Sequence, residues 1–152
     1  MLAESLATTN AGWAREAVEI CCLTPDAVSD MQAVFKLADR IGDAMDYDRL
    51  AKGLIEYRRG NLITAAKYLQ DVHRGFDALA SQATCFLAMI EYRQGNVTAA
   101  KANLEEASKS IAAYARSGEL AWSGDWHEYG RAAITRAEAE RLILGRQVTP
   151  FL

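Results

Sequence analysis

The sequence predicts an all-α protein built from helical hairpins, and three observations indicate this. A motif of the form Glu-Tyr-Arg-x-Gly-Asn occurs at 56–61 and again at 91–96, so its two copies lie 35 residues apart. A fixed period of about 20 to 50 residues is typical of arrays in which each unit buries its apolar face against its neighbours. The chain has only two prolines and is rich in strong helix formers, which favours helix over sheet. No segment shows the two-residue alternation of a half-buried strand.

The first two predicted helices precede residue 43. Asn10 can cap a helix over about 11–23, and Thr24-Pro25 ends it because the residue before proline disfavours helical torsions. A second helix is expected to begin at Ser29 or Asp30 and to be closed by Gly42. The residues expected to face inward from these two helices are Trp13, Ala14, Ala17, Val18, Cys21, Val34, Leu37, Ala38 and Ile41.

The two copies of the motif are expected to form the turns between the helices of the next two hairpins. A third helix is expected to start at Asp46 or Asp48 and to end at Gly60-Asn61, because glycine permits left-handed torsions there. The remaining helices are expected over about 62–74, 77–94, 98–117 and, after a cap at Asp125, from Trp126 to about Leu144. The final helix is expected to cover the exposed face of the sixth helix with Trp126, Tyr129, Ala133 and Ala137. Residues 1–152 are therefore predicted to form one domain with repeats at about 10–43 (degenerate), 46–75 and 77–117 and a capping helix at about 125–145.

Composition excludes several classes of partner. The formal charge is −3 and the Lys and Arg residues are spread along the chain, so we expect no nucleic acid and no anionic lipid surface as a partner. No apolar run approaches the about 18 residues of a membrane span, and the opening Met1-Leu2-Ala3-Glu4 lacks the features of a secretory signal. Three cysteines, Cys21, Cys22 and Cys85, make a poor disulfide framework and indicate reduced, buried thiols in a cytoplasmic protein.

The motif and its surroundings resemble a tetratricopeptide (TPR) repeat. The small residue, aromatic residue, turn glycine and alanine of that family fall at Gly53, Tyr57, Gly60 and Ala65, and then at Ala88, Tyr92, Gly95 and Ala100. The resemblance implies a right-handed α–α superhelix of three TPR-like hairpins plus the C-terminal capping helix. Lys52 and Glu56 depart from the pattern, because the family often has packing residues at these places.

A narrower resemblance covers about the whole chain. It is similar to the C-terminal TPR region of some bacterial serine/threonine protein kinases in Trp13, Leu23-Thr24-Pro25-Asp26-Ala27, Lys52 to Arg58, Trp126 and Arg136 to Glu140. The kinase catalytic signatures are absent. This likeness implies a scaffolding or regulatory part of a bacterial signalling protein.

The first helix of each TPR hairpin lines a concave groove, so the resemblance also implies a partner-binding surface. Carried over position by position, it comprises Tyr47, Leu50, Leu54, Tyr57, Arg58, Gln82, Cys85, Met89, Tyr92 and Arg93. Its expected occupant is a protein or peptide segment, which can belong to another domain of the same parent protein. The alternative is that both tyrosines only pack between hairpins while both arginines are solvated.

Two other functions stay open at this point. One is a homodimer formed through the open end of the stack or the region of Trp122. The other is a small helical ligand-binding protein or enzyme with a cavity between helices, for which Cys85 and His73 are a conceivable nucleophile pair. We expect no enzyme activity, no cofactor and no metal, because His73 and His127 lie far apart without the Cys/His spacing of a zinc site.

Overall fold

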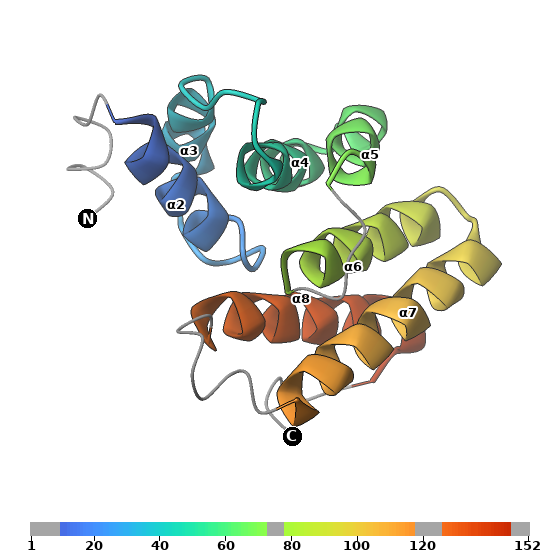
Figure 1. The fold of residues 1–152 in the computed structure, drawn as a ribbon. Coiled ribbons are helices and arrows are strands. Elements are labelled where there is room, and N and C mark those ends of the chain that lie inside the picture. The colour runs from blue at the N-terminus through green and yellow to red at the C-terminus, as the bar shows by residue number, and fades with distance from the viewer. Residues whose placement is uncertain (1–9, 73–77, 118–125, 147–152) are drawn as a thin grey trace. The chain divides into compact units, whose positions relative to one another are not determined.

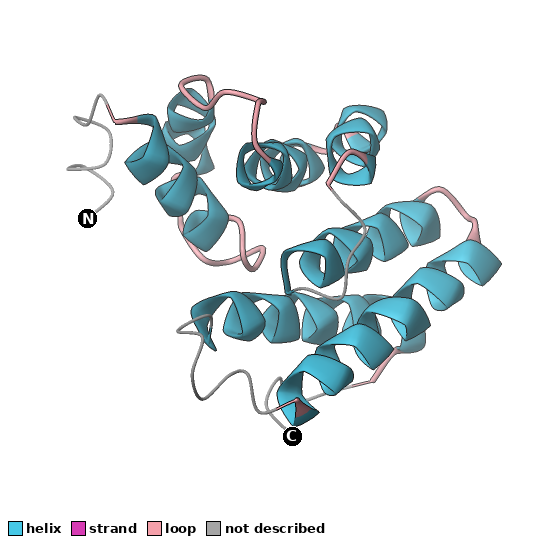
Figure 2. Cartoon of the chain, in the orientation of Figure 1, coloured by secondary structure: helices cyan, strands magenta, loops and turns pink. Residues whose placement is uncertain are grey.

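The computed structural model describes residues 10–72, 78–117 and 126–146. These residues form seven α-helices, labelled α2 to α8, and no strand occurs among them (Figures 1 and 2). The all-α prediction is therefore confirmed. The chain divides into two compact units, Met1–Val72 and His73–Leu152. The boundary falls between the two copies of the motif.

The first hairpin of the first unit comprises α2 (Ala11–Cys21) and α3 (Met31–Ala38). Asn10 caps α2, because its side-chain oxygen accepts a hydrogen bond from the Gly12 backbone N–H at 2.9 Å. Asp30 caps α3 in the same way, by accepting from the Ala33 N–H at 3.1 Å. Both predicted caps are confirmed.

The second hairpin of this unit comprises α4 (Asp46–Arg59) and α5 (Leu62–Gln70). The helix α2 packs against both α3 and α4, and α4 packs against α5. The interior of the unit is apolar and includes Val18, Val34, Leu37, Leu50, Leu54, Ile55 and Leu69. Gly53 lets α4 and α5 approach closely, since a Cβ atom there would lie 2.5 Å from Leu69 Cγ.

The second unit contains α6 (Ala78–Arg93), α7 (Val97–Arg116) and α8 (Trp126–Leu144). These three helices pack against one another, and α8 contacts α6 as well as α7. The sixth predicted helix is α7, so the expected contact of the final helix with it is confirmed, and α8 packs against α6 in addition. Small buried residues on α8, such as Ala133 and Ala137, allow the close approach.

Three predictions about individual residues are wrong. Trp13 and Trp126 were expected to pack, but their side chains are 68% and 69% exposed. Gly42 does not close α3, which ends at Ala38 in turns stabilised by Arg40 N–H to Leu37 O (3.2 Å) and Ile41 N–H to Ala38 O (3.1 Å). Helical periodicity predicts which residues lie on the same face of a helix. The positions of the neighbouring helices then determine which of these residues are buried.

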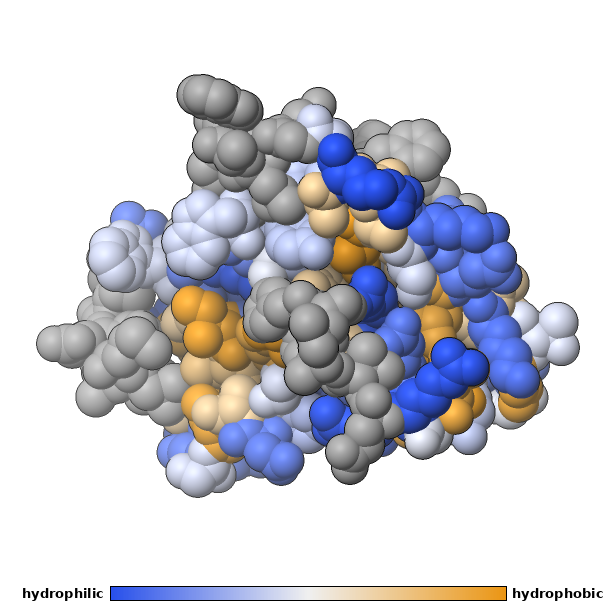
Figure 3. Space-filling model, turned by 90° about the horizontal axis from the view of Figure 1, so that it is seen from below, coloured by the Kyte–Doolittle hydropathy of each residue, from blue (hydrophilic) through white to orange (hydrophobic). Residues whose placement is uncertain are grey.

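Some predictions concern residues outside those that the structure describes, namely His73, Gly75, Trp122 and Asp125. Within the described ranges, no helix combines the length and the apolar content that crossing a bilayer requires. Figure 3 shows that hydrophobic and strongly hydrophilic residues both reach the surface on the face in view.

Candidate functional site

The repeated motif forms the same helix–turn–helix connection in both units. Gly60 and Gly95 both have φ of 86°, a left-handed conformation that favours glycine. The following asparagine folds back on the preceding helix in each copy. Asn61 Nδ2 donates to Glu56 Oε2, and Asn96 Nδ2 donates to Glu91 Oε2, both at 2.7 Å. The glutamate, glycine and asparagine of the motif therefore form a turn. The formation of this turn explains why the three residues occur in both copies.

In the first unit, most of the predicted groove residues lie in the interior. Leu50 and Leu54 are fully buried and Tyr57 is 3% exposed, whereas Tyr47 lies at the surface. The Arg15 guanidinium of α2 stands 5.2 Å from the centre of the Tyr47 ring. These apolar side chains stabilise the unit and are not presented on an open face.

Arg58 has a structural partner at the end of α2. Its Nε donates to the Cys22 carbonyl at 3.0 Å, and its Nη2 donates to the Leu23 carbonyl at 3.2 Å. The last carbonyls of a helix lack partners within the helix and carry partial negative charge. Arg58 therefore satisfies the C-terminus of α2 and joins the two hairpins of the first unit.

In the second unit, the predicted groove residues are divided between interior and surface. Gln82, Cys85 and Met89 are buried, and Gln82 Nε2 donates to Thr135 Oγ1 of α8 at 3.3 Å. Tyr92 is half-buried and Arg93 is exposed. The helix α8 thus takes up part of the face of α6 that the resemblance assigned to a partner.

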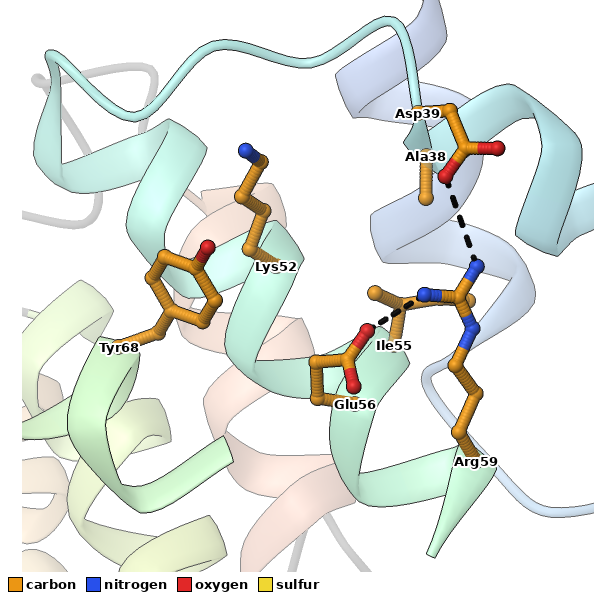
Figure 4. Close-up of a pocket in the computed structure, with 7 residues that line it drawn as sticks. All are labelled: Ala38, Asp39, Lys52, Ile55, Glu56, Arg59 and Tyr68. Atoms are coloured by element: carbon orange, nitrogen blue, oxygen red, sulfur yellow. Dashed lines mark hydrogen bonds and ion pairs between the residues drawn. The ribbon is translucent and has the colours of Figure 1, made fainter. Parts of the chain in front are cut away.

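A cleft of about 260 Å³ opens elsewhere in the first unit, between the end of α3, one face of α4 and α5 (Figure 4). Its lining residues are Ala38, Asp39, Lys52, Ile55, Glu56, Arg59 and Tyr68. Lys52 and Glu56 are the two residues that depart from the TPR pattern.

Arg59 organises one wall of the cleft. Its Nη2 donates to the Phe35 carbonyl at 3.1 Å, and its guanidinium lies 4.7 Å from the centre of the Phe35 ring. Its Nη1 pairs with Glu56 at 2.5 Å and its Nη2 lies 3.8 Å from Asp39 (Figure 4). This arginine fixes the end of α3 against α4 and pairs with Glu56, with a longer contact to the exposed Asp39.

Lys52 and Tyr68 form the other side. Figure 4 shows the two side chains close together, and Lys52 Nζ lies 5.6 Å from the centre of the Tyr68 ring, a cation–π contact. The Lys52 ammonium forms no ion pair with a carboxylate of the described residues, and the Tyr68 hydroxyl forms no hydrogen bond with them. Both groups are therefore free to donate to a ligand.

Sequence reasoning missed this combination of residues. The charges at Lys52 and Glu56 were a signal, because the sequence departs at these two positions from the pattern that it resembles. The sequence around Asp39 and Tyr68 does not mark them as site residues, because they come together only where α3 and α5 approach α4.

The cysteine thiols are poorly suited to nucleophilic chemistry. Burial raises the pKa of Cys22 and of Cys85 to about 12, even though nearby Arg58 and Arg136 respectively favour the thiolate. Burial also raises the pKa of Cys21. A thiol with such a pKa stays protonated at neutral pH and reacts slowly.

The other groups considered for chemistry lie apart from the cleft. His127 is exposed on α8, with its ring 5.9 Å from that of Trp126. Among the residues with described positions, no three His, Cys, Asp or Glu side chains lie together in a way that could hold a metal ion.

Comparisons with models of protein families, with curated proteins and with solved structures find no match to this chain.

Proposed function

We propose that this protein is a non-catalytic interaction module that recruits a peptide segment of a partner protein through the cleft between α3, α4 and α5. The observation that carries the proposal is the cleft itself, in which Lys52 and Tyr68 are left without hydrogen-bonding partners among the described residues. Polar groups of this kind fix the orientation of a bound ligand in a recognition site.

The size of the cleft favours a side chain of a partner over a cofactor. Pockets for small molecules typically have volumes of about 300 to 1,000 Å³, whereas this one has about 260 Å³. One large side chain and its flanking backbone fit that space. The protonated, buried thiols also favour binding over nucleophilic catalysis.

We further propose that the hairpins are TPR-like and belong to a right-handed superhelix. The identical turns at Gly60 and Gly95 and the close packing at Gly53 support this proposal. On the narrower likeness of the sequence, we propose that the module is a scaffolding or regulatory part of a bacterial signalling protein of the kinase type.

Selection from a phage-displayed library of short random peptides tests the proposed function. Enriched peptides are expected to bind the wild type and to lose affinity for the double variant Lys52→Glu, Tyr68→Ala. The matched control is Lys67→Glu, since Lys67 is exposed on the same hairpin and does not line the cleft. Equal binding to the double variant would show that the cleft is not the site, and no enrichment would count against recruitment of peptides. Circular dichroism checks that each variant is folded.

Self-association is a second candidate function, favoured by one observation. Trp13 and Ile20 are exposed on α2 at 68% and 40%, and exposed apolar side chains close together on a helix can mark an interface. If α2 pairs two copies, light scattering will show a dimer that Trp13→Glu dissociates. Trp126→Glu, an equally exposed tryptophan in the other unit, should leave that dimer intact.

A further inference from the structure

We propose that the cleft receives an acidic side chain of the partner segment, with the carboxylate bound by Lys52 Nζ and Tyr68 Oη. This inference rests on the proposed function and adds the chemistry of the recognised residue. It follows from which polar groups of the cleft are already engaged and which are not.

On the acidic side of the cleft, Glu56 and Arg59 are occupied by interactions within the protein, whereas the exposed Asp39 carboxylate comes only to 3.8 Å from Arg59. Glu56 uses both carboxylate oxygens, one for Arg59 at 2.5 Å and the other for Asn61 at 2.7 Å. Arg59 also donates to the Phe35 carbonyl and lies near Asp39. Neither Glu56 nor Arg59 is therefore available to a ligand without breaking contacts that hold α3 and α4 together.

The two groups on the other side of the cleft, the Lys52 ammonium and the Tyr68 hydroxyl, can both donate hydrogen bonds. An ammonium offers three N–H donors and a phenol offers one O–H donor, so the complementary ligand group is an acceptor with negative charge. A carboxylate meets this requirement and makes charge-assisted hydrogen bonds, which are stronger than neutral ones. A phosphate group fits less well, because its charge of about −1.5 to −2 would face Glu56 with one unpaired cation to balance it.

The second copy of the hairpin lacks these donors. The positions 35 residues after Lys52 and Tyr68 are Leu87 and Asn103, and the position after Arg59 is Gln94. The turn is common to both copies, whereas the ammonium and the phenol belong to the α4–α5 hairpin alone. The difference indicates that Lys52 and Tyr68 are not required to build such a hairpin.

Two peptide libraries provide the test. Both consist of short random peptides with blocked ends, one with a fixed central glutamate and the other with glutamine in its place. The immobilised wild type is expected to retain the glutamate library about fivefold more than the glutamine library, the upper range for a partly exposed ion pair. Lys52→Met should abolish this preference, Tyr68→Phe should reduce it, and Lys67→Met should preserve it.

The outcomes separate the inference from the function on which it rests. Peptide binding that Lys52→Glu, Tyr68→Ala abolishes, but that shows no preference for glutamate, would overturn the inference and leave the proposed function standing. A glutamate preference that survives in Lys52→Met would also overturn the inference. If neither library is retained but the same peptides with free C-termini are, the ligand is a terminal carboxylate and the inference is overturned. Absence of any peptide binding would remove both proposals.

Discussion

The α4–α5 hairpin of the first unit and the α6–α7 hairpin of the second are built on the same turn. In each, a glycine at φ 86° ends the first helix, and an asparagine side chain returns to a glutamate of that helix. Three positions around the cleft differ between the copies: Lys52, Arg59 and Tyr68 of the first hairpin correspond to Leu87, Gln94 and Asn103 of the second.

The comparison separates residues that the backbone conformation of the turn requires from residues whose identity depends on the neighbouring helices. The turn requires glycine at one position whatever lies nearby, so it is the same in both copies. The positions around the cleft face α3 in the first unit, and α3 has no counterpart in the second unit, where α8 packs on α6. A repeated motif therefore marks the scaffold, and the site is found where the copies diverge.

The largest expected effect concerns a matched pair of interior residues. Leu54 and Met89 occupy equivalent positions in the two copies, and both are fully buried. Truncation of either to alanine should lower the free energy of unfolding of its unit by about 3 kcal/mol, because it leaves a cavity. Urea unfolding measures this loss. Ile63→Ala, at an exposed position, is the control and should change stability by less than about 0.5 kcal/mol.

Losses below about 1 kcal/mol for Leu54→Ala and Met89→Ala would place these residues on a surface. The groove that the sequence predicted would then regain support.

The next largest effect on stability tests how closely α4 and α5 approach each other within their hairpin. Gly53→Ala should destabilise the first unit by about 1 to 2 kcal/mol, since the new methyl group collides with Leu69 and better helix propensity offsets only part of the strain. The reverse change in the other copy, Ala88→Gly, should cost about 1 kcal/mol through helix propensity. Chemical unfolding of both variants measures the asymmetry. A stabilised Gly53→Ala would mean that α4 and α5 are farther apart than described.

A third prediction concerns pH, because each unit buries a thiol. The pKa of Cys22 and of Cys85 is raised from 9.0 to about 12 in the folded protein, so the folded state holds these protons when the unfolded state has lost them. Stability from this source is complete below pH 9 and declines as the pH rises toward 12, by about 1 kcal/mol per pH unit for each thiol at pH 9.5 to 10.5. The measurement is urea unfolding across this range.

The variants Cys22→Ala and Cys85→Ala isolate the contribution of the thiols from that of other groups that titrate there. Each should show a shallower decline with pH than the wild type. An unchanged slope would mean that the thiols are accessible in the folded state.

The smallest loss of stability is expected from substitution of the turn glycines, and it should be equal in the two copies of the motif. Gly60→Ala and Gly95→Ala should each cost about 1 kcal/mol, the strain of a left-handed conformation at a residue with a side chain. No atom lies within 4 Å of a Cβ built at either glycine, so packing adds nothing. Thermal unfolding compares the two variants, and clearly unequal losses would contradict the equivalence of the turns.

Local chemistry made the helices predictable. The caps at Asn10 and Asp30 and the break at Gly60-Asn61 each depend on residues no more than a few positions apart. Such short-range preferences fix where a helix begins and ends. The predicted start and end of the last helix, Trp126 and Leu144, agree with the bounds of α8.

The site could not be predicted in the same way, because it depends on contacts between distant segments. Arg58 reaches a carbonyl 36 residues earlier in the chain, and no sequence pattern announces such a bond. Asp39 and Tyr68 meet at the cleft only because α3 and α5 both lie beside α4. The resemblance located binding on one face of each hairpin, yet the interior takes up most of that face.

The adjacent arginines at the end of α4 determine which parts of the first unit unfold together. Arg58 holds the carbonyl end of α2, and Arg59 holds a carbonyl of α3. Fraying of the last turn of α4 releases both contacts at once, which couples the two hairpins into one cooperative block. Amide protons of α2, α3 and α4 should therefore exchange with deuterium at a common rate, and Arg59→Gln, which copies the residue of the other hairpin, should let α3 exchange ahead of the rest.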